Sequence, residues 1–317
     1  MNDQARFPDR TTALVLVLVV LMPLVMPATL ATQILIFAIA TLSVILLFGS
    51  VGLLSFGQGL YLGAGAYVAG LLLRDVHIGL LPAILAATLA TTVLAALLGA
   101  IIVRRRDIYF VMLTLAFAQM AYFAALALKD FTGGENGLSG LPRNFGISGL
   151  PIASPLAFYG LTGVLFSLAF LLVQRLNASP VGSVLVAIRD NEARTAAIGY
   201  NVAIYKLAAF AIAGGIVGLA GALHAAFLGF VPPTDIELEM SQRLVVMGLI
   251  GGVGSPAGSL IGAAFYILVS EGLSQVWARW MALIALLIIA IVFYLPGGLW
   301  SIGARLSATA KREKHHG

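Results

Sequence analysis

Long runs of residues without an ionisable side chain alternate with short polar segments along this sequence. The first run covers 11–73, and later runs cover 78–103, 108–128, 144–174 and 244–270. A transmembrane helix needs roughly 20 mostly apolar residues to cross a hydrocarbon core about 30 Å thick, and the runs are long enough for many crossings. The alternation in ten-residue units that marks a membrane barrel is not visible. The pattern therefore predicts an all-α polytopic membrane protein.

The runs divide into about eight full transmembrane helices and a broken or re-entrant pair, up to ten segments in all. The first two helices are expected at 12–26 and 33–48. Because the second apolar stretch follows so closely, the first is interpreted as an uncleaved helix and not as a secretory signal. The other full helices are expected at 52–73, 78–103, 108–128, 156–173, 205–229 and 281–295.

Glycine interrupts two of these apolar segments. The segment 52–73 carries six glycines, and the sequence GGVGSPAG occupies 251–258 in the other. Glycine weakens a helix and lets two backbones approach closely, so tight helix packing is one interpretation. A broken helix that lines a transport pathway is the other, since paired breaks in corresponding places of two halves are typical of transporter repeats.

Four polar side chains within the apolar segments are candidates for a translocation pathway: Ser55, Gln58, Gln119 and His224. Ser55 and Gln58 fall at the first predicted break. His224 lies about one turn from its helix end, so a hydrogen bond at headgroup level or to another helix is the alternative explanation. The sequence shows no obvious partner for His224, and no metal site is predicted.

Composition agrees with the pattern. Only 10% of the residues are charged and 61% are hydrophobic, whereas soluble domains are about a quarter charged. Cysteine is absent, which excludes a disulfide framework and a thiolate metal site. The net charge of +5 is not assigned to nucleic-acid binding, because no basic patch is interleaved with aromatic residues.

The lysine and arginine residues predict orientation, because they gather on the cytoplasmic side of membrane proteins. With a cytoplasmic N-terminus and a segment 244–270 that turns back on itself, 13 cations lie inside and 5 outside; a single crossing there leaves 10 inside and 8 outside. The 13 cations are Arg6, Arg10, Arg104, Arg105, Arg106, Arg175, Arg189, Arg194, Lys206, Arg305, Lys311, Arg312 and Lys314. The 5 are Arg74, Lys129, Arg143, Arg243 and Arg279.

The favoured layout is a cytoplasmic head at 1–10, one transmembrane domain at 11–304 and a basic cytoplasmic tail at 305–317. Both termini are then cytoplasmic, and so is the long polar loop 175–206. This layout rests on the charge bias and on the apolar runs together.

The loop 175–206 carries signals for two short helices. Ser179 and Pro180 suit the N-cap and first position of one helix, and Asp190 or Asn191 suits the cap of a second, EARTAAI. Glu192 is favourable near the positive end of the second helix dipole, and Gly199 suits the left-handed position that ends it. An ordinary solvated connector is the alternative, but two capped helices in one loop favour a docking role.

The predicted contact surface runs from Arg189 to Gly199. Ala193, Ala196 and Ala197 give the second helix a small, flat face that fits a groove. The residues assigned to this contact are Arg189, Asp190, Asn191, Glu192, Ala193, Ala196, Ala197 and Gly199.

Glu192-Ala193, Ala196-Ala197 and Gly199 resemble the EAA-type coupling motif of bacterial ABC importer permeases, with Arg and Thr at 194 and 195. The run from AIRDNEARTAAIG to LGFVPP (187–233) is similar to the LivM family of branched-chain amino acid permeases. TGGENGLSGLP (132–142), SFGQGLYLGAGAY (55–67) and VMGLIGGVGSPAGSLIGA (246–263) also resemble that family. The resemblance extends from about 30 to 303.

The resemblance implies a non-catalytic permease subunit of an ABC importer in the bacterial inner membrane. It implies as partners a second, LivH-like permease subunit, two cytoplasmic ATPase subunits, a periplasmic substrate-binding protein and membrane lipid. The expected cargo is branched-chain or other neutral amino acids. The chain has no G-x-x-x-x-G-K-[ST] phosphate loop, so we expect it to bind no cofactor, with ATP and Mg²⁺ on the partner ATPases.

A stand-alone secondary transporter or channel for small neutral solutes is the alternative function. Ion-coupled carriers generally use ionisable residues at mid-membrane, and the sequence shows none there. An intramembrane enzyme is disfavoured, since no paired carboxylates or metal-ligand spacing occurs in the apolar segments.

Overall fold

The computed structural model describes residues 8–105, 107–142, 146–147, 150–151, 154–276, 280–294 and 297–301. Several sequence predictions lie outside the described residues: most of the head 1–10, the cations Arg106, Arg143 and Arg279, and the basic tail 305–317.

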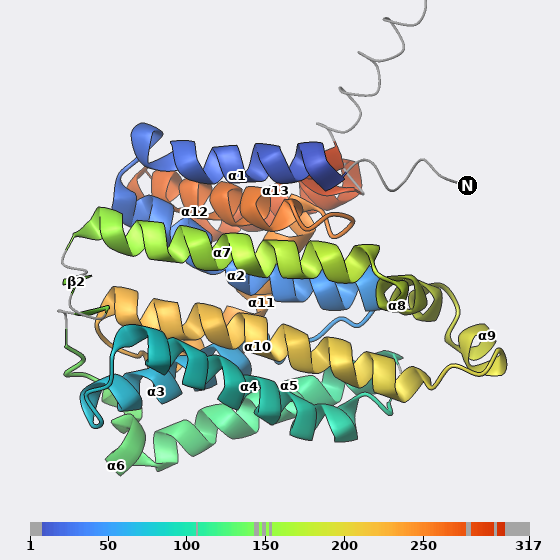
Figure 1. Ribbon diagram of the computed structural model, residues 1–317, viewed down its shortest axis with the longest axis horizontal. Coiled ribbons are helices and arrows are strands. Elements are labelled where there is room, and N and C mark those ends of the chain that lie inside the picture. The colour runs from blue at the N-terminus through green and yellow to red at the C-terminus, as the bar shows by residue number, and fades with distance from the viewer. Residues whose placement is uncertain are drawn as a thin grey trace, which may run out of the picture.

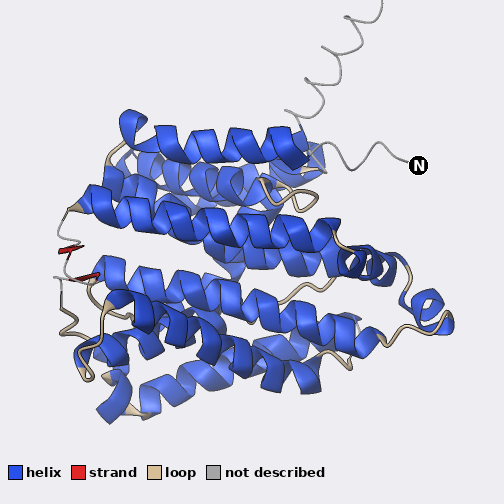
Figure 2. Ribbon diagram, in the orientation of Figure 1, coloured by secondary structure: helices blue, strands red, loops and turns tan. Residues whose placement is uncertain are grey.

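Helices make up almost all of the described chain (Figures 1 and 2). The α-helices are α1 (Pro8–Val25), α2 (Ala28–Val44), α3 (Gln58–Arg74), α4 (Leu80–Ile102), α5 (Asp107–Ala127), α6 (Lys129–Thr132), α7 (Pro155–Ala178), α8 (Pro180–Asp190), α9 (Glu192–Ala197), α10 (Val202–Leu228), α11 (Leu238–Gly251), α12 (Gly258–Val276) and α13 (Trp280–Tyr294). The shorter elements are the π-helix η1 (Ile45–Val51), the 3-10 helices η2 (Gly134–Asn136) and η3 (Pro233–Asp235), and the strands β1 (Gly146–Ile147) and β2 (Leu150–Pro151). The strands pair antiparallel, Gly146 with Pro151 and Ile147 with Leu150.

Five described helical segments are long and apolar enough to cross a membrane: 28–51, 80–102, 108–127, 155–178 and 202–228. A shorter apolar helix covers 11–25. The predicted all-helical class is confirmed. Helix α7 continues to Ala178 instead of ending near 173, because the extended backbone before Pro180 is the first strong helix stop.

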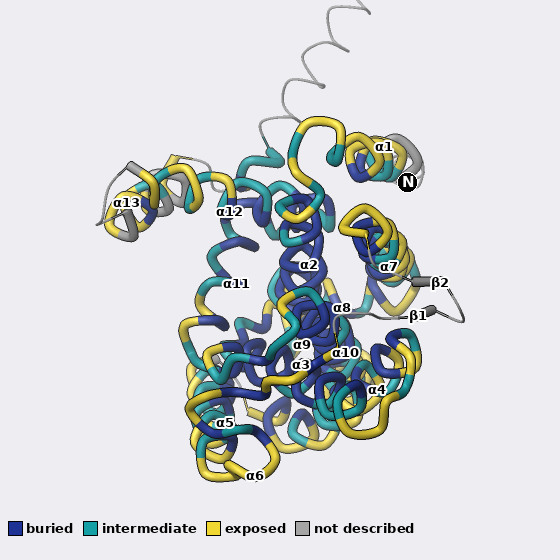
Figure 3. The backbone as a smooth tube through the Cα atoms, turned by 90° about the vertical axis from the view of Figure 1, so that its left-hand side faces the viewer, coloured by how far each residue is buried: buried dark blue, intermediate teal, exposed yellow. Residues whose placement is uncertain are grey.

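The continuous α2–η1 segment is the centre of the bundle. In its most apolar window 89% of the residues are buried, against 28% for α4 and 22% for α5. Helices α7, α10, α11 and α12 all pack against it, and Figure 3 shows α2 as a buried column with α1, α5 and α6 at the periphery. The outer faces of α4 and α5 are therefore apolar but exposed, as contact with lipid requires.

Glycines bring α10 into backbone contact with α3 and α4. A Cβ atom at Gly221 would lie 1.9 Å from the carbonyl oxygen of Leu62, and one at Gly65 would lie 2.3 Å from that of Gly218. No side chain fits in either space. Close packing, one of the two interpretations of the glycines in 52–73, is confirmed at Gly65, and α3, α4 and α10 pack tightly against one another.

The segment 52–73 is a broken helix, as one of the two interpretations proposed. Gly52 ends η1 with a left-handed φ of 78°, and α3 begins only at Gln58. The N-terminus of α3 lies beside that of α11, where the Gly59 backbone N–H donates a 2.8 Å hydrogen bond to Ser241 Oγ. Helix α3 thus starts inside the bundle.

The second glycine-rich segment is the turn of a helical hairpin. Helices α11 and α12 run antiparallel, because Gly251 packs against Gly258 and the Met247 carbonyl packs against Gly262. The chain therefore turns back on itself at 252–257, as the charge count favoured. The two breaks meet in space, since a Cβ at Gly49 would lie 2.1 Å from the Val253 carbonyl oxygen.

The described chain begins and ends near the same end of the bundle, the end that carries α8 and α9. Thr12 of α1 donates a 2.7 Å hydrogen bond to Gln174 near the end of α7. After α13, Gly298 packs against Gly252 at the hairpin turn. Figure 1 shows the start of α1 with α8 and α9 at the right, while α6 and β2 lie at the left. We call these the α9 end and the opposite end.

Candidate functional site

Helices α8 and α9 form where the capping signals predicted them. The Gly182 backbone N–H donates to Ser179 Oγ at 3.3 Å, with Pro180 in the first turn. The Arg194 N–H donates to Asn191 Oδ1 at 2.8 Å. Asn191, and not Asp190, is therefore the cap of α9, because its backbone has the extended conformation that lets the side chain reach back.

Gly199 follows α9 with a left-handed φ of 98°, as predicted. No atom lies within 4 Å of where its Cβ would be. The requirement for glycine at this position is conformational and does not come from packing.

An ion pair ties α9 to the start of α10. Lys206 Nζ lies 2.6 Å from Glu192 Oε2, and the two side chains are 4% and 26% exposed. Thr195 is buried beside them and donates from Oγ1 to the Asn191 carbonyl oxygen at 3.0 Å. Helix α9 has only six residues, too few to persist alone in water, so these contacts hold it in place.

Arg189 joins the end of α8 to the first break. Its guanidinium donates to the Gly49 carbonyl oxygen at 2.5 Å and lies 3.3 Å from Asp190. A Cβ at Gly52 would lie 2.8 Å from Arg189 Cγ, so the stem of the arginine rests on the left-handed glycine that ends η1. A displacement of α8 would therefore act directly on the α2–η1 segment.

A cavity of about 410 Å³ lies between these elements. Its lining includes Leu54, Phe110, Arg189, Glu192 and Lys206, so residues from the break, α5, α8, α9 and α10 meet around one space. The space therefore adjoins both the first break and the α8–α9 unit.

The outer face of α9 is exposed and mostly uncharged. Ala193, Ala196 and Ala197, which were assigned to the contact face, are all exposed. Ile198 is 68% exposed, and the sequence analysis did not single it out. Figure 1 shows α9 projecting beyond the rest of the bundle. Glu192, a member of the predicted contact set, instead contacts Lys206 and is only 26% exposed.

The four predicted pathway residues occupy different environments. Ser55 and Gln58 are buried, with Ser55 Oγ accepting from the Gly57 N–H at 3.2 Å and Gln58 Oε1 accepting from Ser43 at 3.1 Å. Gln119 is half-buried on α5, and His224 is buried on α10. The structure gives no contact that joins the four into one site.

The structure supplies the partner for His224 that was not obvious from the sequence, and it favours the explanation by a hydrogen bond. His224 Nδ1 lies 3.0 Å from Asp235 Oδ2, with the side chains 9% and 1% exposed. The His224 ring also meets the Phe37 ring edge-on at 5.5 Å between centroids. The acidic segment after α10 folds back into the bundle as η3, and this return places a carboxylate inside.

A groove of about 360 Å³ is lined by residues of α2, α11 and α12. The residues that line it are Gln33, Phe37, Arg243, Met247, Tyr266, Ile267, Ser270, Glu271 and Ser274. None of the four predicted pathway residues is among them. The sequence analysis counted Arg243 only among the outside cations and did not single out Glu271, because nothing local in the sequence indicates that they share a cavity.

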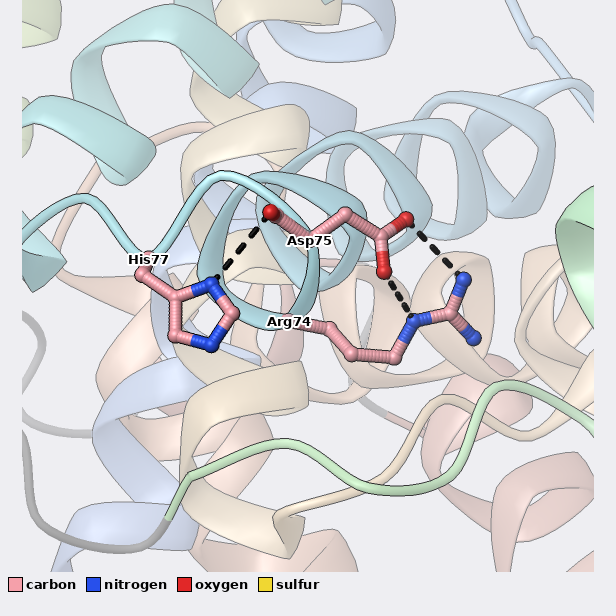
Figure 4. A network of polar contacts seen from close by, with 3 residues as sticks. All are labelled: Arg74, Asp75 and His77. Carbon is pink, nitrogen blue, oxygen red and sulfur yellow. Dashed lines mark hydrogen bonds and ion pairs between the residues drawn. The ribbon is translucent and has the colours of Figure 1, made fainter.

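A small polar network marks the opposite end of the bundle (Figure 4). The Arg74 guanidinium lies 2.6 Å from an Asp75 carboxylate oxygen, and His77 Nδ1 lies 3.3 Å from the Asp75 carbonyl oxygen. The hydrogen bond from Arg74 lowers the pKa of the exposed Asp75 carboxyl. The network closes the turn after α3, where His77 has a left-handed φ of 55°.

The comparisons with known proteins converge on one family. The family described as "Branched-chain amino acid transport system / permease component" matches residues 26–293. The chain is 26% identical to the high-affinity branched-chain amino acid transport system permease protein LivM of Salmonella typhimurium and 27% identical to that of Escherichia coli. Each match covers 85% of this chain and 68% of the relative.

A second group of relatives carries a different cargo in its name. The autoinducer 2 import system permease protein LsrC of Salmonella paratyphi B is 28% identical over 58% of this chain and 54% of the relative. No solved structure matches the chain.

Proposed function

Since this chain belongs to the LivM-containing family of branched-chain amino acid transport permeases, a family of multi-pass membrane proteins, we propose that it is the permease subunit of an ABC importer. It moves branched-chain or other neutral amino acids into the cytoplasm. Hydrolysis of ATP on partner subunits drives the movement through α8 and α9. The observation that carries the proposal is the projecting α9, capped by Asn191 and anchored through the Glu192–Lys206 ion pair.

The α8–α9 unit acts as the coupling element. Its exposed face, chiefly Ala193, Ala196, Ala197 and Ile198, docks on a cytoplasmic ATPase subunit. The inward contacts of Glu192 and Arg189 then pass the displacement to α10 and to the α2–η1 segment. An ATPase that prefers one position of α9 when it binds ATP biases the bundle toward one of two states, which is how a ligand on one subunit changes access in another.

The assembly contains a second, LivH-like permease subunit, two ATPase subunits and a periplasmic substrate-binding protein. The ATP and Mg²⁺ belong to the ATPases, and this chain is a non-catalytic transport subunit without a bound cofactor. The absence of a phosphate-loop sequence supports that division of labour.

The α9 end faces the cytoplasm and the membrane is the bacterial inner membrane. Arg104, Arg105, Arg175, Arg189 and Arg194 belong to the turn after α4, the end of α7 and the α8–α9 unit, and the positive-inside rule supports this orientation. Both termini then lie in the cytoplasm, with eight full crossings and a broken pair. The domain boundaries stay as proposed from the sequence: the head 1–10, the permease domain 11–304 with its loop 175–206, and the tail 305–317.

A second candidate function, an ion-coupled transporter that works alone, is favoured by one observation. The buried His224–Asp235 pair places ionisable groups inside the bundle, and such groups mark ion or proton pathways in secondary transporters. Family membership favours the ABC importer. The two functions differ in their energy source, because only the ABC importer requires ATP for uptake.

The test is reconstitution in proteoliposomes with the candidate ATPases, the second permease subunit and the binding protein, followed by uptake of labelled leucine. Uptake is expected only with ATP, and the Glu192→Ala, Gly199→Pro double variant is expected to lose both uptake and stimulated ATP hydrolysis. Arg74→Gln, at the opposite end, is the matched control. Uptake that persists without ATP, or normal coupling in the double variant, overturns the proposal.

A further inference from the structure

The groove between α2, α11 and α12 carries opposite charges on facing helices. Arg243 lies on α11 and Glu271 on α12, and both line the same space of about 360 Å³. That volume falls within the range of about 300–1,000 Å³ typical of sites for small molecules. No ion pair joins Arg243 to Glu271 among the described residues.

The two charges are available to a ligand. Arg243 contacts Glu239 through one terminal nitrogen at 3.3 Å, which leaves most of the five guanidinium N–H donors free. The Glu271 carboxylate is exposed and forms no hydrogen bond or ion pair within the described part of the chain. A cation and an anion that line one cavity without neutralising each other match a ligand that carries both charges.

Ser270 supplies a third, independent observation. Its Oγ is buried and has no hydrogen-bond partner among the described residues, although it lines the groove. A buried hydroxyl without a partner costs free energy, so such groups are normally satisfied. A ligand ammonium or carboxylate in the groove would satisfy it.

The remaining wall is apolar. Phe37, Met247 and Ile267 line the groove beside the charged groups. Phe37 also touches the His224 ring, so the wall of the groove is continuous with the buried His224–Asp235 contact. An unbranched polar solute would leave this surface without a complementary group, whereas a branched aliphatic side chain would cover it.

We propose that this groove is a transient binding site for a zwitterionic, apolar α-amino acid on its way through the membrane. Arg243 binds the α-carboxylate, Glu271 binds the α-ammonium, and Ser270 accepts or donates a hydrogen bond to one of them. Phe37, Met247 and Ile267 receive the side chain. The inference rests on the proposed transport function and adds the site that handles the cargo.

The absence of cysteine from the chain permits a direct test in the complete reconstituted complex. A Ser274→Cys reporter sits on an exposed, groove-lining position and is labelled with a small thiol reagent, with and without leucine. Leucine is expected to slow labelling about threefold or more when it occupies most of the sites. A Leu128→Cys reporter is the control. Leu128 directly follows α5 at the opposite end of the bundle and is exposed, and leucine should leave its labelling unchanged.

Arg243→Gln and Glu271→Gln, each added to the reporter, remove one charge while keeping similar size. Each is expected to abolish protection by leucine and to lower uptake about tenfold, as the loss of a charge-assisted hydrogen bond predicts. Ser270→Ala gives a smaller loss in the same direction.

Failure of this inference is distinct from failure of the proposed function. If wild-type uptake is driven by ATP but leucine does not protect the reporter, or if both charge variants transport normally, the groove is not a substrate site. A reporter that never reacts, as when a neighbouring subunit fills the groove, also overturns the inference. If uptake needs no ATP yet protection is present, the site stands and the ABC assignment falls.

Discussion

The Lys206 ammonium at the start of α10 lies 2.6 Å from the Glu192 carboxylate on α9, and the lysine side chain is almost fully buried. The pair spans a turn that contains the left-handed Gly199. A six-residue helix is thereby held against a 27-residue helix of the bundle. Removing one partner of such a pair costs more than the pair contributes, because the other charge is left without compensation.

Lys206→Met is therefore expected to detach α9 while leaving the bundle folded. The loss in stability is about 1–3 kcal/mol, below the range for a fully buried pair because Glu192 is partly exposed. Thermal unfolding of the purified subunit measures the loss, and leucine uptake in the full complex should fall in parallel. Lys129→Met, at the opposite end of the bundle, is the control. Wild-type uptake in Lys206→Met would contradict the anchoring role.

Ile198→Asp tests the exposed face of α9. Ile198 is 68% exposed, so the substitution should change the stability of the subunit by no more than about 0.5 kcal/mol. A charge in an apolar docking surface should nevertheless weaken binding of the ATPase about tenfold or more. Co-purification of the subunits measures this. Val76→Asp is the matched control, because Val76 is similarly exposed at the opposite end; equal losses in both variants would refute docking at α9.

Gly221→Ala tests the contact between α10 and α3. The new Cβ would lie 1.9 Å from the Leu62 carbonyl oxygen, which forces the two helices apart and should cost about 1–3 kcal/mol or more. The unfolding midpoint of the subunit in detergent measures the cost. Gly160→Ala on α7 is the control, since no atom lies within 4 Å of its Cβ position and alanine is the better helix former. A control as unstable as Gly221→Ala would contradict the packing argument.

The Arg74–Asp75 contact predicts a local dependence of stability on pH. The hydrogen bond from Arg74 lowers the folded-state pKa of Asp75 below its ordinary 3.8. The contribution of the ionised Asp75 carboxyl to the free energy of unfolding is therefore fully present above pH 3.8. It is lost as the pH falls through the lower, folded-state pKa. Unfolding of the wild type and of Asp75→Asn should differ at pH 7 and converge in strong acid. A difference that stays constant with pH would show that the charge is irrelevant.

The local structure of the coupling unit was predictable because capping depends on neighbouring residues. Ser179 caps α8 and Asn191 caps α9, and Gly199 has the left-handed conformation that was expected. These features need only side chains that lie two or three positions from the backbone groups they satisfy. The inward direction of Glu192 was not predictable in the same way, since its partner Lys206 is 14 residues away.

The buried His224–Asp235 contact was missed for a related reason. Asp235 lies in a segment rich in proline and acid, a composition typical of an exposed loop. It is buried because the chain after α10 returns into the bundle as η3 before α11 begins. The sequence signal that was available is the pair of prolines at 232 and 233, which indicates a sharp turn but not its direction.

The sequence by itself determined the class of the protein, its apolar segments, the start of α8 and the positions of the two glycine-rich segments. Hydropathy, capping and glycine conformation act within one or two helical turns, so they can be read without a fold. Only the tertiary structure decided that the breaks meet, that Asp235 reaches His224, and that Arg243 and Glu271 share a groove. Those contacts depend on how helices far apart in the chain pack, and side-chain burial on such faces has no local signature.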